Sequence, residues 1–240
     1  MLPHLAILGR HILDGLRGVG EVAWLFATVL RWLVRSWTGR AAGAAPSALE
    51  RQSLVRQLYV VGVQSLPVIL TTGAFTGMVL AYSSFFQLQR LDVTSWTGPL
   101  LAKSLVTQLG PVLAGLMLAG RVGCAMTAEL GTMAVTEQVD ALRCMGVDPV
   151  RFLVLPRFLA CLLMTPILTG FAMAIGILAG FALAIHGLGA EEHFMIEQTR
   201  AWMFNWDYVQ GLAKASFFGA AIALICCHKG LRTRGGAEGV

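Results

Sequence analysis

Four long stretches that are almost free of charge limit what this chain can fold into. Three contain no Asp, Glu, Lys or Arg and the fourth contains only Lys214; they cover residues 57–89, 104–120, 158–190 and 208–228. A helix needs about 20 mostly apolar residues to cross a bilayer. The pattern therefore predicts four transmembrane helices, near residues 58–83, 100–121, 158–186 and 207–228. The third stretch is longer than a bilayer requires, so we expect its helix to tilt, to kink at Pro166 or to project beyond the lipid.

The composition predicts an integral membrane protein of the all-α class. Charged residues form 13% of the chain and hydrophobic residues 56%, whereas soluble domains carry about 25% charged residues. The net charge of +5 comes from basic residues that flank the apolar stretches, which is typical of membrane topology and not of nucleic-acid binding. The five cysteines show no CxxC pair and no metal-ligand spacing, so we interpret them as small packing residues.

The placement of arginine predicts the orientation. The region that ends at Arg56 carries seven Arg and three acidic residues. Segment 121–157 carries four Arg, and the tail carries Lys229, Arg232 and Arg234. The positive-inside rule places these three regions, and with them the N-terminus, in the cytoplasm.

Residues 1–50 are predicted to form an interfacial helix and a linker. Apolar residues recur there at steps of three and four: Leu5, Leu8, Ile12, Leu16, Val19, Ala23, Phe26, Leu30 and Leu33. A second stripe at the same spacing is polar: Arg10, Asp14, Arg17, Glu21, Thr28, Arg31 and Arg35. Two such stripes are typical of an amphipathic helix that lies in the headgroup plane. A cleaved signal peptide is the alternative, but Arg10 and Asp14 would interrupt its apolar region.

Segment 120–157 carries eight of the 31 formal charges of the chain (18 basic and 13 acidic) between the second and third predicted spans. It predicts a short helix over residues 136–146. The signals are an N-cap, two acids in the first turn, a basic residue near the end, a C′ glycine and a terminating pair: Thr136, Glu137, Asp140, Arg143, Gly146 and Asp148-Pro149. Such a helix either merely connects two spans or docks onto a soluble partner.

Several motifs in and around this helix carry a resemblance to a known family. They are the runs Ala128-Glu129-Leu130-Gly131-Thr132-Met133, Thr136-Glu137-Gln138, Asp140-Ala141-Leu142, Met145-Gly146-Val147-Asp148-Pro149 and Pro156-Arg157. With these runs the chain resembles the MlaE/YrbE family, the permease subunits of lipid-transporting ABC systems associated with MCE proteins. The resemblance extends from about Val60 to Val240 and implies a permease domain over residues 51–240. Family members continue past the segment matching residues 235–240, so a fifth span is expected after residue 240.

The resemblance also implies partners and a location. It implies a homodimer in the bacterial inner membrane that moves phospholipid, or a similar lipid, between that membrane and a periplasmic MCE-domain protein. A separate cytoplasmic ABC ATPase would bind ATP and Mg²⁺, and no cofactor is expected on this chain. The short helix would then couple to the ATPase through Thr136, Glu137, Gln138, Asp140, Ala141, Arg143 and Met145.

Two further groups of residues are candidates. The family places its lipid cavity against the first span, where polar and apolar side chains suit a lipid head and tail: Gln64, Phe75, Val79 and Tyr82. Arg121 and Glu129 are eight residues apart, which is about two turns on one face of a continuous helix. They either form an internal ion pair or mark a place where lipid enters or protomers meet. Two GxxxG motifs allow close helix contacts in lipid: Gly73 to Gly77 and Gly176 to Gly180.

Motifs for other functions are missing from the sequence. It has no GxxxxGK[ST] phosphate loop, no HExxH, no GxSxG and no Cys/His cluster, which argues against ATP binding on this chain and against an intramembrane enzyme. A secondary transporter or channel that needs no ATPase remains the alternative. Such a protein requires coupling charges at mid-membrane depth, and only Lys214 lies well inside a predicted span.

Overall fold

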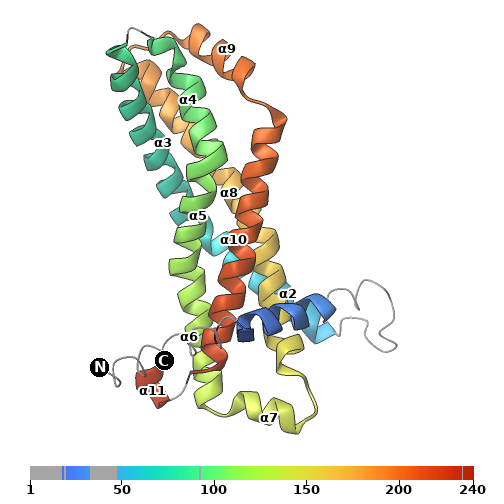
Figure 1. Ribbon diagram of the computed structural model, residues 1–240. Coiled ribbons are helices and arrows are strands. Elements are labelled where there is room, and N and C mark those ends of the chain that lie inside the picture. Colours follow the sequence, from blue (N-terminus) through green and yellow to red (C-terminus); the bar gives the residue numbers. More distant parts are fainter. Residues whose placement is uncertain (1–17, 19, 33–47, 92, 234) are drawn as a thin grey trace, which may run out of the picture. The chain divides into compact units, whose positions relative to one another are not determined.

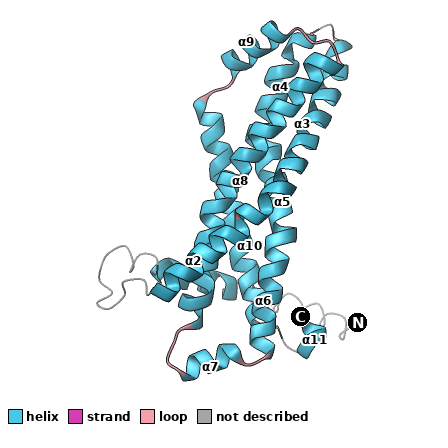
Figure 2. Cartoon of the chain, turned by 180° about the vertical axis from the view of Figure 1, so that it is seen from behind, coloured by secondary structure: helices cyan, strands magenta, loops and turns pink. Residues whose placement is uncertain are grey.

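The computed structural model describes residues 18, 20–32, 48–91, 93–233 and 235–240. Every regular element within these residues is a helix (Figure 2), which confirms the predicted all-α class. Among them, four helical stretches are long and apolar enough to cross a membrane: Gln52–Gln89, Thr97–Val135, Val150–Gly187 and Asn205–Leu231. Each of these stretches contains one predicted span and continues beyond it at both ends.

The described chain divides into two compact units. The larger unit contains Val55–Cys124 and Leu159–Ile222. The smaller unit contains the described residues up to Leu54, together with Ala125–Phe158 and Ala223–Val240. The candidate lipid-binding residues therefore belong to the larger unit, and the candidate coupling helix belongs to the smaller one.

Long helices make up most of the larger unit. The first membrane-spanning stretch joins most of α2 (Ala48–Val61) to a 3₁₀ turn, Val63–Ser65, and to α3, Leu66–Gln89. A proline stands at the start of α3, where a missing backbone N–H is tolerated. A second 3₁₀ turn, Thr94–Trp96, leads into α4 and α5. The remaining helices follow in chain order: α4 (Thr97–Ser104), α5 (Gly110–Leu118), α8 (Leu155–Ala182), α9 (Glu192–Trp202) and α10 (Asn205–Leu231).

Short π-helical segments of five residues each interrupt or extend these helices. They are Leu105–Leu109, Ala119–Gly123, Val150–Val154 and Leu183–Gly187. A π segment is rare, inserts an extra residue into the helix and breaks the regular hydrogen-bond ladder. The segment Leu105–Leu109 separates α4 from α5, so the second span is not one regular α-helix.

Small residues bring α3 and α8 into close contact within the larger unit. A Cβ atom added to Gly73 would lie 2.7 Å from the carbonyl oxygen of Ala172, and one added to Gly180 would lie 2.8 Å from that of Gly77. Gly77 also faces the backbone of Gly176. The two GxxxG motifs therefore form the close helix contact that the sequence predicts, and this contact lies within one chain.

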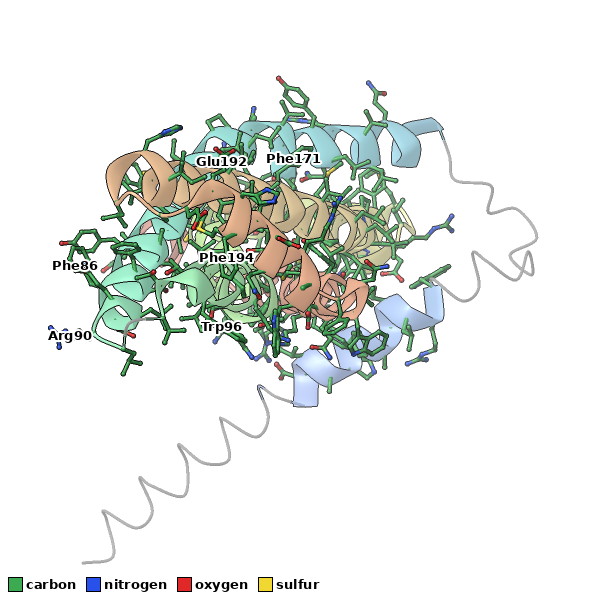
Figure 3. The ribbon with its side chains drawn as sticks, turned by 90° about the horizontal axis from the view of Figure 1, so that it is seen from above. Phe86, Arg90, Trp96, Phe171, Glu192 and Phe194 are labelled. Carbon is green, nitrogen blue, oxygen red and sulfur yellow. The ribbon has the colours of Figure 1, made fainter. Side chains whose placement is uncertain are left out.

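At one end of the larger unit, α9 lies beside α4 (Figure 1). Gly98 of α4 leaves room for Met195 and Thr199 of α9. The rings of Trp96 and Trp202 are 4.8 Å apart between centroids. Phe86 and Arg90, at the same end, point away from the helices at the edge of the unit (Figure 3). This end therefore combines packed and outward-pointing aromatic side chains.

The smaller unit contains a helix over residues 20–32, part of α2 (Ala48–Val61), nearly all of α6 (Cys124–Val135), α7 (Gln138–Cys144), the C-terminal part of α10 and α11 (Gly236–Gly239). Gly230 of α10 allows α6 to come close, because a Cβ there would lie 2.7 Å from the Leu130 side chain. The Thr127 hydroxyl donates to the Cys226 carbonyl at 3.4 Å. These contacts join α6 to the end of α10.

The helix over residues 20–32 has three distinct faces, whereas the sequence predicts two. Leu25 and Val29 are buried against the smaller unit, although neither belongs to the predicted apolar stripe. Ala23, Phe26 and Leu30, which do belong to it, are exposed. The exposed stripe lies roughly a third of a turn around the helix from the buried pair and remains suited to a lipid surface. The predicted path of the region Trp24–Trp37 along the cytoplasmic face lies partly outside the described residues.

Candidate functional site

The α7 helix begins two residues later than the sequence predicts. Thr136 is not its N-cap, because the Thr136 N–H donates to the Thr132 carbonyl at 3.0 Å and its hydroxyl donates to the same carbonyl at 2.8 Å. Thr136 thus completes the last turn of α6, a back-bonding mode that competes with capping. Glu137 takes the N-cap position instead, and its side chain makes no capping hydrogen bond.

The C-terminus of α7 agrees with the prediction. Gly146 adopts a φ of 77° at the C′ position. Its N–H donates to the Arg143 carbonyl at 3.0 Å, and the Val147 N–H donates to the Leu142 carbonyl at 3.0 Å. These two bonds form a Schellman motif, which satisfies the free carbonyls at the end of the helix. Asp148 accepts a hydrogen bond from the Val150 N–H at 3.0 Å, where the next helical segment begins.

Glu137 has an unusual backbone conformation. Its φ of 59° and ψ of 13° place it in the left-handed region, and it is the one non-glycine residue with a positive φ among the described residues. This conformation costs about 1–2 kcal/mol for a residue with a Cβ. The turn between α6 and α7 therefore holds a glutamate where glycine or asparagine would be less strained.

A wide groove separates α7 from the segment that follows α10 within the smaller unit. Its volume is about 800 Å³. We call it the α7 groove, and its lining is mostly polar: Ala134, Val135, Glu137, Val139, Asp140, Arg143, Leu231, Arg232, Thr233, Gly235 and Gly236. Asp140 and Arg143 form an exposed ion pair at 2.8 Å along one wall. Three of the predicted coupling residues therefore line one groove.

A second, smaller groove lies on the other side of α7. It has a volume of about 340 Å³ and a mostly apolar lining: Met133, Gln138, Val139, Ala141, Leu142, Met145, Phe152 and Leu153. The other predicted coupling residues on α7 and at its end line this groove, and Met145 is 69% exposed. Thr136 lines neither groove. The helix thus presents a charged side and an apolar side.

The other wall of the α7 groove is fixed to the N-terminal helix by ionic contacts. The Arg232 guanidinium donates to the Glu21 carboxylate at 2.6 Å, and His228 Nε2 lies 3.5 Å from the same carboxylate. The Arg151 guanidinium stacks over the Trp32 ring at 5.1 Å. The helix over residues 20–32 therefore holds both the end of α10 and the segment after α7.

Glu129 and Arg121, one possible ion pair from the sequence, each have a different partner in the structure. Glu129 forms an ion pair with Arg157 at 2.8 Å, and the Arg157 side chain is almost fully buried. Arg121 donates to the Ser65 hydroxyl. Sequence spacing did not find these partners because they come from distant segments, and Arg121 sits in a π segment where the α-helical period does not apply.

The four predicted lipid-binding residues lie on the surface of the larger unit. Phe75, Val79 and Tyr82 are 66%, 66% and 54% exposed and follow one another at helical spacing along α3. Gly73 and Gly77, which pack on α8, lie about half a turn away from them. The exposed Gln64 lies just before α3. One side of α3 thus packs within the chain while the other presents an unpaired apolar stripe.

The chain matches the model of one protein family over most of its length. The family model for the permease MlaE matches residues 54–240. The chain belongs to the MlaE permease family. It is 39% identical over 241 residues to a probable ABC transporter permease protein of Rickettsia typhi, covering 100% of this chain and 89% of that protein.

Two other relatives are similar over most of this chain. The intermembrane phospholipid transport system permease protein MlaE of Haemophilus influenzae is 33% identical over 237 residues, covering 98% of this chain and 87% of that protein. The chloroplastic protein TRIGALACTOSYLDIACYLGLYCEROL 1 of Arabidopsis thaliana is 35% identical over 189 residues, covering 79% of this chain and 54% of that protein. The chain is therefore a multi-pass permease subunit of an ABC transporter, which implies an ATPase partner.

Two lysines in the spans of this MlaE-family permease have partners that sequence reasoning missed. The Lys214 ammonium donates to the Thr107 carbonyl at 2.7 Å. Thr107 lies in the π segment that follows α4. Lys103 lies 3.8 Å from the Asp207 carboxylate and 5.8 Å from the centre of the Phe204 ring. Among the described residues, no group of three or more His, Cys, Asp or Glu side chains could hold a metal ion.

Proposed function

We propose that this chain is the permease subunit of an ABC transporter that moves phospholipid, or a similar lipid, between the inner membrane and a periplasmic MCE-protein assembly. The family membership and the name of the Haemophilus influenzae relative, an intermembrane phospholipid transport system permease protein, support the lipid substrate. ATP and Mg²⁺ bind to a separate ATPase subunit, and the permease itself needs no cofactor. The N-terminus lies in the cytoplasm, in keeping with the arginine distribution.

The observation that carries the proposal is the division of α3 into two sides. The glycines of one side pack against α8, so this side is already occupied. The other side exposes Phe75, Val79 and Tyr82 in a row. In a membrane, an apolar stripe of this kind contacts either lipid or another protein chain, because lipid tails and apolar side chains are similar environments.

Two copies of the permease place these stripes around a shared lipid cavity. Phe75, Val79 and Tyr82 contact the acyl chains, and Gln64 supplies a polar group at one end of the row. The ATPase subunit binds at α7, where the charged side lines the α7 groove and the apolar side lines the smaller groove. The MCE-domain protein binds on the periplasmic side.

The test is purification of the permease with its partners, followed by mass spectrometry of the bound lipid. The variants Phe75→Glu, Val79→Glu and Tyr82→Glu should lower lipid recovery without releasing the ATPase. Leu178→Glu is a matched control, because Leu178 is 64% exposed on α8 and the variant adds the same charge to another span.

Two results would contradict the proposal. Unchanged lipid recovery in all three α3 variants would remove the cavity assignment. Lipid transport by the permease without any ATPase would favour the alternative, a secondary transporter or channel. A co-purifying subunit with a phosphate-binding loop would exclude that alternative.

A further inference from the structure

Lys214 lies deep in the fourth span, where a charged side chain is costly. It stands nine residues after Asn205, the first residue of α10, which is about 14 Å along the helix, against a hydrocarbon core of about 30 Å. Among the described residues no carboxylate forms an ion pair with Lys214. Ionisable side chains at this depth are rare and mark a function. The contact that Lys214 does make is therefore informative.

The partner of Lys214 is a backbone carbonyl that has lost its α-helical donor. In an α-helix the carbonyl of Thr107 accepts from the N–H four residues further on. That residue is Pro111, which has no N–H. In the π register the donor comes five residues further on, and for Val106 this residue is again Pro111. Pro111 thus removes the α donor of one carbonyl and the π donor of the carbonyl before it.

Within the larger unit, α10 comes close enough to supply the missing donor (Figure 1). A Cβ atom added to Gly211 would overlap the Val106 carbonyl oxygen, so glycine is needed at this approach. One turn later, the Lys214 ammonium donates to the Thr107 carbonyl at 2.7 Å. Hydrocarbon offers no water to a free carbonyl, so a proline inside a span is tolerated where neighbouring helices satisfy the backbone groups that it frees.

We propose that Lys214 is a positioning residue for lipid transport, which replaces the backbone N–H that Pro111 lacks and so holds the π segment between α4 and α5 in its observed form. The donor is the ammonium group, and the acceptor is the Thr107 carbonyl. The role in transport rests on the proposed function, whereas the contact itself does not. The one lysine deep in a span is thereby explained without coupling to an ion.

One double variant separates this role from its rivals. A lysine that binds a lipid headgroup or couples transport to an ion acts through its charge, and no change at Pro111 would replace that charge. A lysine that acts as a backbone donor becomes dispensable once residue 111 carries an N–H. The two roles therefore make opposite predictions for Lys214→Met/Pro111→Ala.

The experiment uses the full permease, purified with its partners and reconstituted in proteoliposomes. Lys214→Met removes the donor and keeps the length of the side chain, while Pro111→Ala restores the N–H. We expect Lys214→Met to lower the unfolding midpoint by about 5 °C. It should also lower the rate of lipid transport per folded complex about tenfold, with unchanged recovery of bound lipid. The double variant should regain most of both losses.

A matched control tests the effect of charge. Lys103→Met removes an equal charge from another lysine of the larger unit, whose partner is the Asp207 carboxylate at 3.8 Å and not a backbone carbonyl. Adding Pro111→Ala should not change the effect of Lys103→Met. An equal rescue of both lysine variants would overturn the inference, because Pro111→Ala would then stabilise the permease in general.

The other outcomes are also decisive. Equal losses in Lys214→Met and in the double variant would overturn the inference and assign the charge itself to lipid or to an ion. Unchanged transport per folded Lys214→Met complex would reduce the contact to stability alone. If Lys214→Met does not fold, the double variant should fold, and its failure would overturn the inference. A wild-type complex that transports no lipid would contradict the proposed function, while rescue of the unfolding midpoint would still establish the contact.

Discussion

Arg157 and Glu129 form an ion pair in which one side chain is buried and the other is partly exposed. Their N–O distance is 2.8 Å, and the side chains of Arg157 and Glu129 are 4% and 43% exposed. The guanidinium also donates to the Leu153 carbonyl at 3.4 Å, while its Nε has no hydrogen-bond partner among the described residues. The Glu129 carboxylate is therefore the main compensation for a buried positive charge.

Removing the negative charge of Glu129 alone should destabilise the smaller unit. Glu129→Gln leaves the Arg157 charge buried without its counter-charge, and we expect a loss of about 1–3 kcal/mol, less than for a fully buried pair because Glu129 is partly exposed. Thermal unfolding in detergent would measure it. The double variant Glu129→Gln/Arg157→Met should recover part of the loss, since it removes the unpaired charge. A double variant that is less stable than both single variants would show that the pair contributes in another way.

Reversing two charges on α7 should release the ATPase. Glu137→Lys/Asp140→Lys reverses two charges on the side of α7 that we propose to contact the ATPase, and like charges at an interface cost several kcal/mol. The variant should remain inserted and dimeric, because both side chains are exposed, but it should lose the ATPase in pull-down and lose lipid transport. A double variant that keeps a fully coupled ATPase would reduce α7 to a connector.

Replacing Glu137 by glycine should separate stability from binding. Glycine adopts a positive φ without steric cost, so Glu137→Gly should raise the unfolding free energy by about 1 kcal/mol. The same variant loses the carboxylate and should bind the ATPase more weakly. An unfolding midpoint equal to or below that of the wild type would indicate that the turn is not strained.

Adding a methyl group at Gly77 should disturb the contact between α3 and α8. A Cβ at Gly77 would overlap the backbone of Gly176, which cannot move aside as a flexible side chain could. Gly77→Ala should therefore destabilise the permease by about 1–3 kcal/mol. Gly120→Ala is the matched control, since nothing lies within 4 Å of a Cβ there. Equal unfolding midpoints for the two variants would contradict the predicted clash.

The sequence predicts well the features that depend on local pattern. Uncharged runs locate the four spans, and Gly146 marks the end of α7, because both signals are properties of neighbouring residues. It predicts poorly what depends on tertiary contacts. The start of α7 is misplaced because the Thr136 hydroxyl bonds back into α6. The pairing of Glu129 with Arg157 joins two segments whose contact no helical period encodes.

The π segment Leu105–Leu109 changes the helical register between α4 and α5, so the two helices of the second span face different neighbours. Before it, α4 turns Gly98 toward α9; after it, α5 turns Gly115 toward Phe218 of α10. One residue added to or removed from a helix rotates everything beyond it by about 100°. Deleting a single residue between positions 105 and 109 would therefore mainly rotate α5 about its axis relative to α4. The side of α5 that now faces α10 would then point elsewhere, although every side chain of α5 would be unchanged.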